Sequence, residues 1–253
     1  MSIPKGSVRK KSFAATTWQS LVSFSRDNRF FRKGDVVLCG LSGGPDSVCL
    51  LHFLKELSRI KGFSLRAVHV NHQLRGGDST ADEKFSKKLC AEIAVPIDVY
   101  RVNVKSLAGR GGYSLEHAAR KARYGAFERA AKKRGAAVVA VAHHLDDNVE
   151  TMLLGLLRGA SLKSLRGIAS KRPLSPGVSV VRPLLCITRS EVMDYIAEHG
   201  LAYRTDKSNE SEDFTRNWVR LTLLPLLESK QPRFRQHMLA LSRELLAVDS
   251  GKK

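Results

Sequence analysis

The stretch DVVLCGLSGGPDS, residues 35–47, decides the fold of this chain. Its first half, Asp35–Leu41, is a short apolar run with β-branched residues, which is typical of a buried strand. Its second half, Ser42–Ser47, is rich in glycine and leads into Val48–Ile60, where apolar residues recur at helical spacing. The stretch therefore predicts a strand, a tight turn and a helix in direct succession.

The turn at residues 42–47 has the composition of an anion-binding loop. Its two glycines allow a sharp turn that brings backbone N–H groups close to a ligand, and the following helix offers a partly positive N-terminus. Its serines add hydroxyl donors, its proline suits a first helical turn, and its aspartate suits a magnesium ion that bridges phosphates. The spacing matches neither the Walker loop nor GxGxxG, and an ordinary capped turn is the alternative. We predict that the phosphates of a nucleotide contact Ser42, Gly43, Gly44, Pro45, Asp46 and Ser47.

Strand and helix patterns alternate through most of the chain. Further strands are expected at 64–70, 96–102, 136–142 and 178–183, and further helices at 78–93, 114–134, 146–158 and 188–199. This alternation predicts an α/β fold, with an open, mostly parallel sheet of about five strands and helices on both faces. Residues 170–177, which include two prolines, are expected to form a loop.

The strand pattern stops after Gly200, and helices are expected near 212–228 and 231–247. We therefore divide the chain into three parts. These are a basic N-terminal extension at 1–33, a nucleotide-binding catalytic domain at 34–205 and a helical C-terminal extension at 206–253. The last part is too short to form a full domain of its own.

The composition argues against several classes of protein. The 253 residues are 43% hydrophobic and 26% charged, as in ordinary globular proteins rather than disordered ones. No apolar run approaches the roughly 20 residues that cross a bilayer, so no membrane partner is expected. The 4 cysteines form no CxxC pair, which argues against a zinc ribbon, an iron–sulfur site or a disulfide scaffold. A reduced, cytoplasmic protein is the simplest interpretation.

The formal net charge of +19 favours a polyanionic partner. Residues 101–135 contain ten basic side chains and two acidic ones, and residues 158–172 contain five basic side chains and no acid. Nucleic acid is the favoured partner because neutralising many phosphates releases many counterions. A solubility adaptation is the alternative. Acidic side chains gather instead at Asp146, Asp147 and Glu150, which needs an explanation of its own.

The loop SGGPDS resembles the pyrophosphate (PP) loop of the N-type ATP pyrophosphatases, whose sheet is of the adenine nucleotide alpha-hydrolase type. Further motifs follow in order: VHVNHQLRG at 68–76, SLEHAARKARY at 114–124, AHHLDDNVET at 142–151, RPLL at 182–185, DKSN at 206–209 and TRNWVR at 215–220. In this order and at these spacings, the chain from about Asp35 to Leu227 resembles the tRNA(Ile)-lysidine synthase family. One departure is Lys207, at a place where that family usually has proline.

This resemblance implies a ligase that forms a C–N bond on tRNA at the expense of ATP. Members of the family join free L-lysine to C2 of the wobble cytidine in the CAU anticodon of tRNA(Ile). The C2 oxygen is first adenylated with release of pyrophosphate, and the lysine ε-amine then displaces AMP to give lysidine. The expected cofactors are ATP and Mg2+, and the expected partners are that tRNA and free lysine. The larger members have a full tRNA-binding C-terminal domain, which we do not expect here, and a homodimer stays an open alternative to a monomer.

Charged residues at helical spacing supply candidates for this chemistry. Asp147 and Glu150 are three apart at the start of a helix, so they share a face that suits an ammonium group, and one carboxylate could take its proton. Arg120 and Arg123 are also three apart and would place positive charge near the phosphates. With the resemblance, the expected catalytic residues are Asp46, Arg120, Asp147 and Glu150. Additional nucleotide contacts are expected from His69 and Asn71, substrate contacts from Arg123, His143, Asp147, Glu150, Arg216 and Asn217, and metal ligation by Asp46 and Asp146. Helix capping by the acids, and core or surface positions for the histidines and arginines, are the structural alternatives.

Three other functions of the same fold are alternatives to lysine transfer. A tRNA thiolase is the first alternative, but sulfur transfer needs a reactive cysteine, and Cys39 and Cys49 lie where burial is expected. An amidating ligase needs an ammonia source, for which no glutaminase portion is visible. RNA binding without catalysis would require neither the glycine-rich loop nor the acidic pair.

Overall fold

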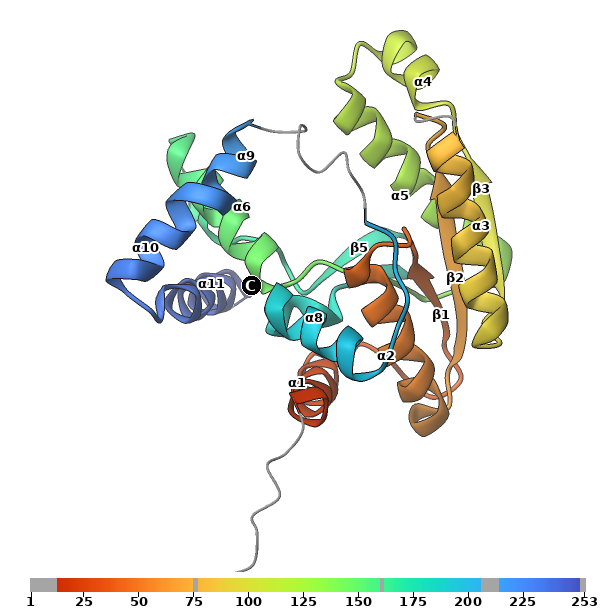
Figure 1. Ribbon diagram of the computed structural model, residues 1–253, viewed down its shortest axis with the longest axis horizontal. Helices are drawn as coiled ribbons and strands as arrows, with labels where there is room; N and C mark the ends of the chain where they lie inside the picture. The colour runs from red at the N-terminus through yellow and green to blue at the C-terminus, as the bar shows by residue number, and fades with distance from the viewer. Residues whose placement is uncertain (1–12, 75–76, 160–161, 206–213, 251–253) are drawn as a thin grey trace, which may run out of the picture.

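The computed structural model of this chain describes residues 13–74, 77–159, 162–205 and 214–250. Six strands form its single described sheet, and they are β1 (Val36–Gly40), β2 (Ser64–Asn71), β3 (Ile97–Arg101), β4 (Val138–Ala140), β5 (Lys171–Ser175) and β6 (Val178–Val181). Their order across the sheet is β3-β2-β1-β4-β6-β5 (Figure 1). All neighbours pair in parallel except β5, which runs antiparallel to β6. The expected open and mostly parallel sheet is therefore confirmed.

Helices connect and surround these strands. The described helices are α1 (Phe13–Asp27), α2 (Pro45–Lys61), α3 (Gly77–Glu92), α4 (Val104–Gly111), α5 (Leu115–Arg134), α6 (Leu145–Leu157), α7 (Leu162–Leu165), α8 (Arg189–Glu198), α9 (Phe214–Trp218), α10 (Leu224–Lys230) and α11 (Phe234–Ser250). A 3-10 turn, η1 (Pro183–Cys186), precedes α8, and a π-helical turn, η3 (Val219–Leu223), joins α9 to α10.

Residue alternation along the strands assigns helices to the two faces of the sheet. Val37 and Cys39 of β1 contribute to the larger core, in which α1, α2, α3 and α8 take part. Leu38, between them, points to the other face, where it shares a core with Phe127 of α5. The predicted cover of helices on both faces is confirmed.

Local signals explain where the central helices begin and end. The hydroxyl of Ser114 accepts a hydrogen bond from the backbone N–H of His117 and so caps α5. Gly135 ends α5 with a left-handed φ of 63°, a conformation that glycine adopts without steric cost. At α8, Thr188 and Glu191 form a reciprocal capping box.

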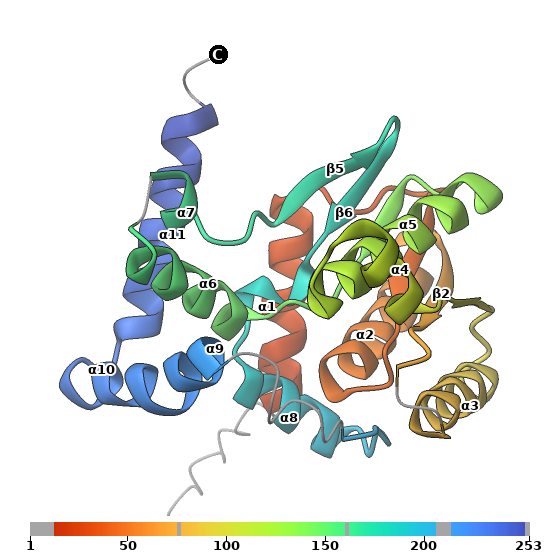
Figure 2. The ribbon, with the colours of Figure 1, turned by 90° about the horizontal axis from the view of Figure 1, so that it is seen from above.

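The elements after β4 build a second group of helices beside the sheet. α6, η3, α10 and α11 enclose a separate apolar cluster that includes Val149, Met152, Val219 and Leu224. Figures 1 and 2 show α6, α9, α10 and α11 gathered to one side of the sheet, with α8 and α1 between the two groups. The carboxyl ends of β1 and β4 lead into α2 and α6. They therefore lie where the sheet meets the second group of helices.

The structure differs from the expected elements in two places. The sheet has six strands rather than five, because part of the expected loop at 170–177 forms β5. Pro173 is tolerated there because β5 is an edge strand, with an irregular register between Pro173 and Ser175. The expected helix at 212–228 is divided by the π-helical turn η3.

Part of the expected basic extension at 1–33 is a packed helix. Leu21 of α1 is fully buried in the larger core, and Phe30 follows it there. Residues 1–12 of that extension and the DKSN motif at 206–209 lie outside the described residues. In the described part of the chain, every helix is too short or too polar to cross a membrane.

Candidate active site

The glycine-rich loop after β1 lies at the carboxyl edge of the sheet and is closed around the Ser47 hydroxyl. That hydroxyl accepts hydrogen bonds from the backbone N–H groups of Ser42 and Gly43, both at 3.2 Å, and donates to the Gly44 carbonyl at 2.9 Å. Gly43 has a φ of +95°, and a Cβ there would lie 3.3 Å from the Phe85 ring. The conformation therefore favours glycine, and a larger residue would also press on the Phe85 ring.

The helix that follows the loop begins without a side-chain cap. Gly44 is the N-cap of α2, Pro45 is its first residue, and no side chain accepts from the N–H groups of its first turn. Such groups have no partner within the helix and carry partial positive charge. An anion would complete the cap, so the residues present fit the predicted phosphate site.

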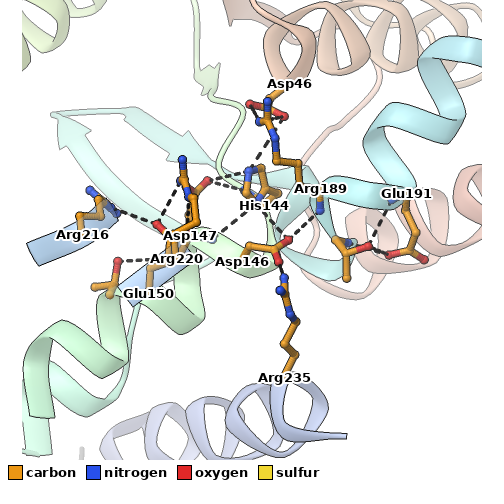
Figure 3. A network of polar contacts seen from close by, with 12 residues as sticks. Asp46, His144, Asp146, Asp147, Glu150, Arg189, Glu191, Arg216, Arg220 and Arg235 are labelled. Atoms are coloured by element: carbon orange, nitrogen blue, oxygen red, sulfur yellow. Dashed lines mark hydrogen bonds and ion pairs between the residues drawn. The ribbon is translucent and has the colours of Figure 1, made fainter. Parts of the chain in front are cut away.

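His144, which belongs to the AHHLDDNVET motif but was given no site role from the sequence, links this loop to the predicted carboxylates. His144 is 2% exposed and stands at the centre of an acidic network made of Asp46, His144, Asp146, Asp147 and Glu150 (Figure 3). Its Nε2 is 3.9 Å from Asp46 Oδ1 and 3.6 Å from Asp147 Oδ2. Its Nδ1 is 3.4 Å from Asp146 Oδ2. The loop aspartate Asp46 and the α6 aspartates Asp146 and Asp147 therefore surround one imidazole.

The same histidine caps α6. The Asp147 backbone N–H donates to His144 Nδ1 at 3.4 Å, and Asp147 Oδ2 accepts from the His144 backbone N–H at 3.0 Å. The capping role considered for these acids is thus present at Asp147. The cap uses Oδ2 of the carboxylate. The other oxygen, Oδ1, lies 3.9 Å from Arg220 Nη2.

Two arginines neutralise the aspartates on the α8 side of the network. Arg189 Nη1 donates to both oxygens of Asp46, at 3.1 and 2.9 Å, while its backbone N–H donates to Asp146 Oδ2 at 2.6 Å. Asp146 also forms an ion pair with Arg235 of α11. Arg189 therefore joins the loop aspartate to the α6 aspartate, and α11 closes the network from below in Figure 3.

Glu150 is fully buried and is held by two further arginines. Arg220 Nε and Nη2 donate to its oxygens at 2.7 and 3.1 Å, and Arg216 Nε donates at 3.1 Å. Arg220 Nη2 is also 3.9 Å from Asp147 Oδ1. Hydrogen bonding to Glu150 raises the pKa of Arg220. Arg216, expected to contact substrate, is thus an ion-pair partner of Glu150, and Asn217 lies beside it on α9.

His69 and Asn71, expected to contact the nucleotide, are buried behind the loop. His69 Nδ1 is 2.9 Å from the Leu41 carbonyl and 3.3 Å from the Ser86 hydroxyl, so it supports the chain just before the loop. Burial lowers the pKa of His69. The Asn71 amide donates to Glu83 Oε2 at 3.1 Å, which ties β2 to α3. These contacts position the loop, and the proposed contact with the nucleotide stays a prediction.

Glu83 gives this support a pH dependence. Hydrogen bonds from Arg101, with smaller contributions from Lys87 and Asn71, lower the pKa of Glu83 from 4.5 to about 2. A carboxylate with a depressed folded pKa contributes stability above its unfolded pKa and loses it as the pH falls through the folded value. We expect the stability advantage of the wild type over Glu83→Gln to be complete near neutral pH and to shrink between about pH 4.5 and about pH 2. Urea unfolding of both proteins over this range measures it, and a pH-independent difference would contradict the assignment.

Arg120, Arg123 and His143 gather on the other side of the β4 end. His143 Nδ1 accepts a hydrogen bond from Arg182 Nε at 3.2 Å. Burial, and then the charges of Arg182, Arg120 and Arg123, lower the pKa of His143 to about 3, so its imidazole is neutral. The adjacent histidines therefore separate an acidic side, at His144, from a basic side, at His143.

The donor groups decide which predicted metal ligand fits. Mg2+ in nucleotide sites takes one or two carboxylates together with phosphate oxygens and water. Asp46 fits this pattern, because its side chain is 26% exposed beside the loop. Asp146 fits less well, because it is 7% exposed and bound by Arg189 and Arg235. Among the described residues, no group of three His, Cys, Asp or Glu side chains is arranged to hold a metal ion alone.

The arginines of this site were the largest omission from the sequence analysis. Arg189, Arg220 and Arg235 reach the network from α8, η3 and α11, up to 143 positions away from their partners. Arg189 and Arg220 stand inside or beside regular helical patterns, where a solvated face is the default interpretation. The only signal for these arginines was an acidic residue expected to be buried without an oppositely charged neighbour in sequence. Such a residue requires a counter-charge from elsewhere in the chain.

Comparison with known proteins agrees with this geometry. An ATP-binding family model described as a PP-loop domain matches residues 15–227. The tRNA(Ile)-lysidine synthase of Dehalococcoides mccartyi is 42% identical over 210 residues, covering 81% of this chain and 45% of that protein. The tRNA(Ile)-lysidine synthase of Bacteroides thetaiotaomicron is 38% identical over 227 residues, covering 90% of this chain and 51% of that protein. The chain therefore spans about half the length of the curated relatives it matches.

A solved structure supports the fold independently. The U34-tRNA thiolase NcsA from Methanococcus maripaludis superposes with a TM-score of 0.78 at 20% identity, covering 93% of this chain and 80% of that one. At this identity the likeness concerns the fold alone. The range matched by the family model includes the glycine-rich loop, all six strands and the acidic network. This chain belongs to the family of ATP-binding PP-loop domains.

Proposed function

We propose that this chain ligates L-lysine to C2 of the wobble cytidine in the CAU anticodon of tRNA(Ile), with ATP as the energy source. The observation that carries the proposal is the acidic network. His144 places Asp147 of α6 next to Asp46 of the PP loop, at 3.6 and 3.9 Å from the same imidazole nitrogen. A carboxylate that suits an ammonium group thus adjoins a loop that suits a polyphosphate. The identity of 37–42% to curated lysidine synthases supports the same reaction.

Within this proposal, the PP loop binds ATP and releases pyrophosphate after the C2 oxygen of the cytidine is adenylated. Asp46 would hold Mg2+, which neutralises phosphate charge and orients the leaving group when bound. Arg120 and Arg123 would supply further positive charge toward the phosphates or the RNA. His69 and Asn71 would act by holding β2 and α3 behind the loop.

The amine must reach the adenylated carbon in its neutral form, because only a free electron pair attacks. We propose that Asp147 receives the lysine ammonium group and takes its proton, since its side chain is 17% exposed while that of Glu150 is 1% exposed. Glu150 would hold Arg216 and Arg220 behind Asp147, and Asn217 would lie next to this pair. His143, on the basic side, would contact the substrate in its neutral form.

Thiolation, the alternative, receives less support. Burial is the largest cause that raises the pKa of all four cysteine thiols, Cys39, Cys49, Cys90 and Cys186. Thiolates are the reactive form, so these environments disfavour sulfur transfer. The curated relatives at 37–42% identity are lysidine synthases, while the thiolase match rests on 20% identity.

The deciding experiment supplies purified protein with ATP, Mg2+ and radiolabelled lysine. Unmodified tRNA(Ile) with a CAU anticodon is compared with elongator tRNA(Met) as acceptor. We expect label only in the isoleucine tRNA, with AMP and pyrophosphate formed in equal amounts. Pyrophosphate release that depends on RNA, without lysine incorporation, would contradict the lysine assignment and keep the adenylating fold. We also propose that the protein is cytoplasmic, which cell fractionation tests. A homodimer is part of the same proposal, and light scattering tests it.

A further inference from the structure

Tyr124 of α5 has two guanidinium groups over its ring. Arg120, one turn earlier on the helix, has its Cζ 5.1 Å from the ring centroid, and Arg172 of β5 has its Cζ 4.5 Å from it. Both distances are those of cation–π contacts. Arg120 is exposed and Arg172 is half-buried, so these side chains form a surface rather than a sealed interior.

Arg182, which follows β6, is 3% exposed and lies close to Tyr124, Arg172 and Arg120. Its Nε donates to His143 and its Nη1 donates to the Ala169 carbonyl at 2.6 Å, and both acceptors are neutral groups. In the described part of the chain, no carboxylate lies within ion-pair distance of Arg120, Arg172 or Arg182. We call Arg120, Tyr124, Arg172 and Arg182 the arginine–tyrosine cluster. A buried guanidinium among further guanidiniums is costly unless an anion joins it.

Two titratable groups record the positive field of this cluster. Burial raises the pKa of Tyr124, but Arg172, Arg120 and Arg182 outweigh it, so the pKa lies below its ordinary value. The pKa of His143 falls to about 3 through burial and then through the charges of Arg182, Arg120 and Arg123. Arg120 and Arg182 therefore act on both the phenol and the imidazole.

The cluster occupies its own part of the sheet edge. Along the carboxyl edge, the PP loop follows β1, the two histidines follow β4 and Arg182 follows β6. The antiparallel strand β5 starts at this edge, and Arg172 is its second residue, paired with Val180 near the end of β6. Strands are spaced by about 4.8 Å, so the PP loop and Arg182 stand roughly 10 Å apart. The phosphates of a nucleotide in the loop and an anion on the cluster therefore occupy different positions.

We propose that the arginine–tyrosine cluster binds the phosphodiester backbone of the RNA substrate and positions the target nucleotide against the PP loop. This inference rests on the proposed function, because it assigns the RNA partner of the same site to named residues. The net charge of +19 and the row of guanidiniums extending from a buried to an exposed position suit a strand of phosphates better than a single one. The guanidiniums of Arg120 and Arg172 both lie over the Tyr124 ring, so in this proposal Tyr124 orients the two arginines toward the phosphates.

The test measures binding of a fluorescein-labelled anticodon stem-loop RNA by fluorescence anisotropy over a series of KCl concentrations. Arg172→Gln removes one phosphate contact at an edge strand. We expect about fivefold weaker binding at moderate salt and a slope of log K against log salt that is smaller by about 0.7–0.9. Arg172→Lys keeps the charge but not the planar fork over Tyr124, so we expect the slope to be kept and the affinity to fall by about twofold to threefold.

A matched control lies on the same helix. Arg129 also stands over a tyrosine, with its Cζ 5.5 Å from the ring of Tyr100 in β3, but it belongs to the C-terminal half of α5. Arg129→Gln removes the same charge and the same kind of contact, and we expect its salt slope to equal that of the wild type. Thermal melting of each variant confirms that the fold is retained.

The outcomes separate this inference from the proposed function. A wild-type salt slope in Arg172→Gln, together with lysine incorporation by the wild type, would overturn the inference and leave the function standing. Weaker binding of a fluorescent ATP analogue by Arg172→Gln, with unchanged RNA binding, would overturn it by assigning the cluster to the nucleotide. Failure of the wild-type protein to bind the RNA at all would overturn both.

Discussion

Asp147→Asn is expected to raise the lysine concentration for half-maximal rate by about 30- to 150-fold while changing the free energy of unfolding by less than about 0.5 kcal/mol. A hydrogen bond between a carboxylate and an ammonium group contributes about 2–3 kcal/mol in a partly desolvated site, and each 1.4 kcal/mol corresponds to about tenfold in affinity. The fold should tolerate the change, because an asparagine oxygen can still accept from the His144 backbone N–H as Asp147 Oδ2 does at 3.0 Å.

Glu150→Gln supplies the matched comparison, because it is equally conservative and lies one helical turn away. Glu150 is fully buried and receives three hydrogen bonds from Arg216 and Arg220. Breaking a buried ion pair costs about 3–5 kcal/mol, but these arginines are 36% and 37% exposed, so water compensates in part and we expect about 2–3 kcal/mol. The loss should appear in urea unfolding as a lower free energy of unfolding, because the arginines of α9 and η3 lose their hydrogen bonds to α6.

The pair of variants therefore separates a binding role from a supporting one. Lysine titrations at saturating ATP and tRNA give the kinetic effect, and urea unfolding gives the stability. If Asp147→Asn lost stability and kept its lysine dependence, Asp147 would be a helix cap only. If Glu150→Gln showed the larger change in lysine dependence at unchanged stability, the ammonium group would bind at Glu150 after displacing an arginine.

The sequence was sufficient for those features that depend on neighbouring residues. The strand, loop and helix at 35–60 follow from apolar periodicity and from glycines, and the structure places β1, the PP loop and α2 there. The proximity of the loop to Asp147 also follows, because parallel strands β1 and β4 end at the same edge of the sheet. The fold class, and the shared face of Asp147 and Glu150 on α6, were therefore predictable from the sequence alone.

Features that depend on distant residues were not predictable in this way. β5 was missed because Pro173 and the neighbouring Pro176 indicate a loop, and only the position of the strand at a sheet edge makes Pro173 acceptable within it. Arg182 was quoted within the RPLL motif, but its burial beside His143 depends on β6 and β4 being neighbours. The partner of Asp46 was missed because Arg189 is 143 positions away.

The pair of Asp46 and Arg189 leads to a second prediction, on the rate of pyrophosphate release. Asp46→Asn is expected to lower kcat for RNA-dependent pyrophosphate release by at least about 100-fold, with little change in RNA binding. Asp46 is the predicted Mg2+ ligand at the PP loop, and neutralising phosphate charge through a metal supplies several kcal/mol, of which 2.7 kcal/mol corresponds to about 100-fold in rate. Asparagine keeps the size of the side chain and one acceptor oxygen, so the loop geometry around the Ser47 hydroxyl should persist.

Arg189→Gln distinguishes loss of the metal ligand from loss of the ion pair, because both variants break the same contact. Arg189 holds both oxygens of Asp46 at 2.9 and 3.1 Å, and a cation that binds Asp46 must compete with it. We therefore expect Arg189→Gln to reach half-maximal rate at a lower Mg2+ concentration than the wild type, whereas Asp46→Asn needs a higher one. Initial rates across a Mg2+ titration at fixed ATP measure both shifts. Equal Mg2+ dependence in all three proteins would show that Asp46 does not hold the metal, and its pairing with Arg189 would then serve to join the PP loop to α8.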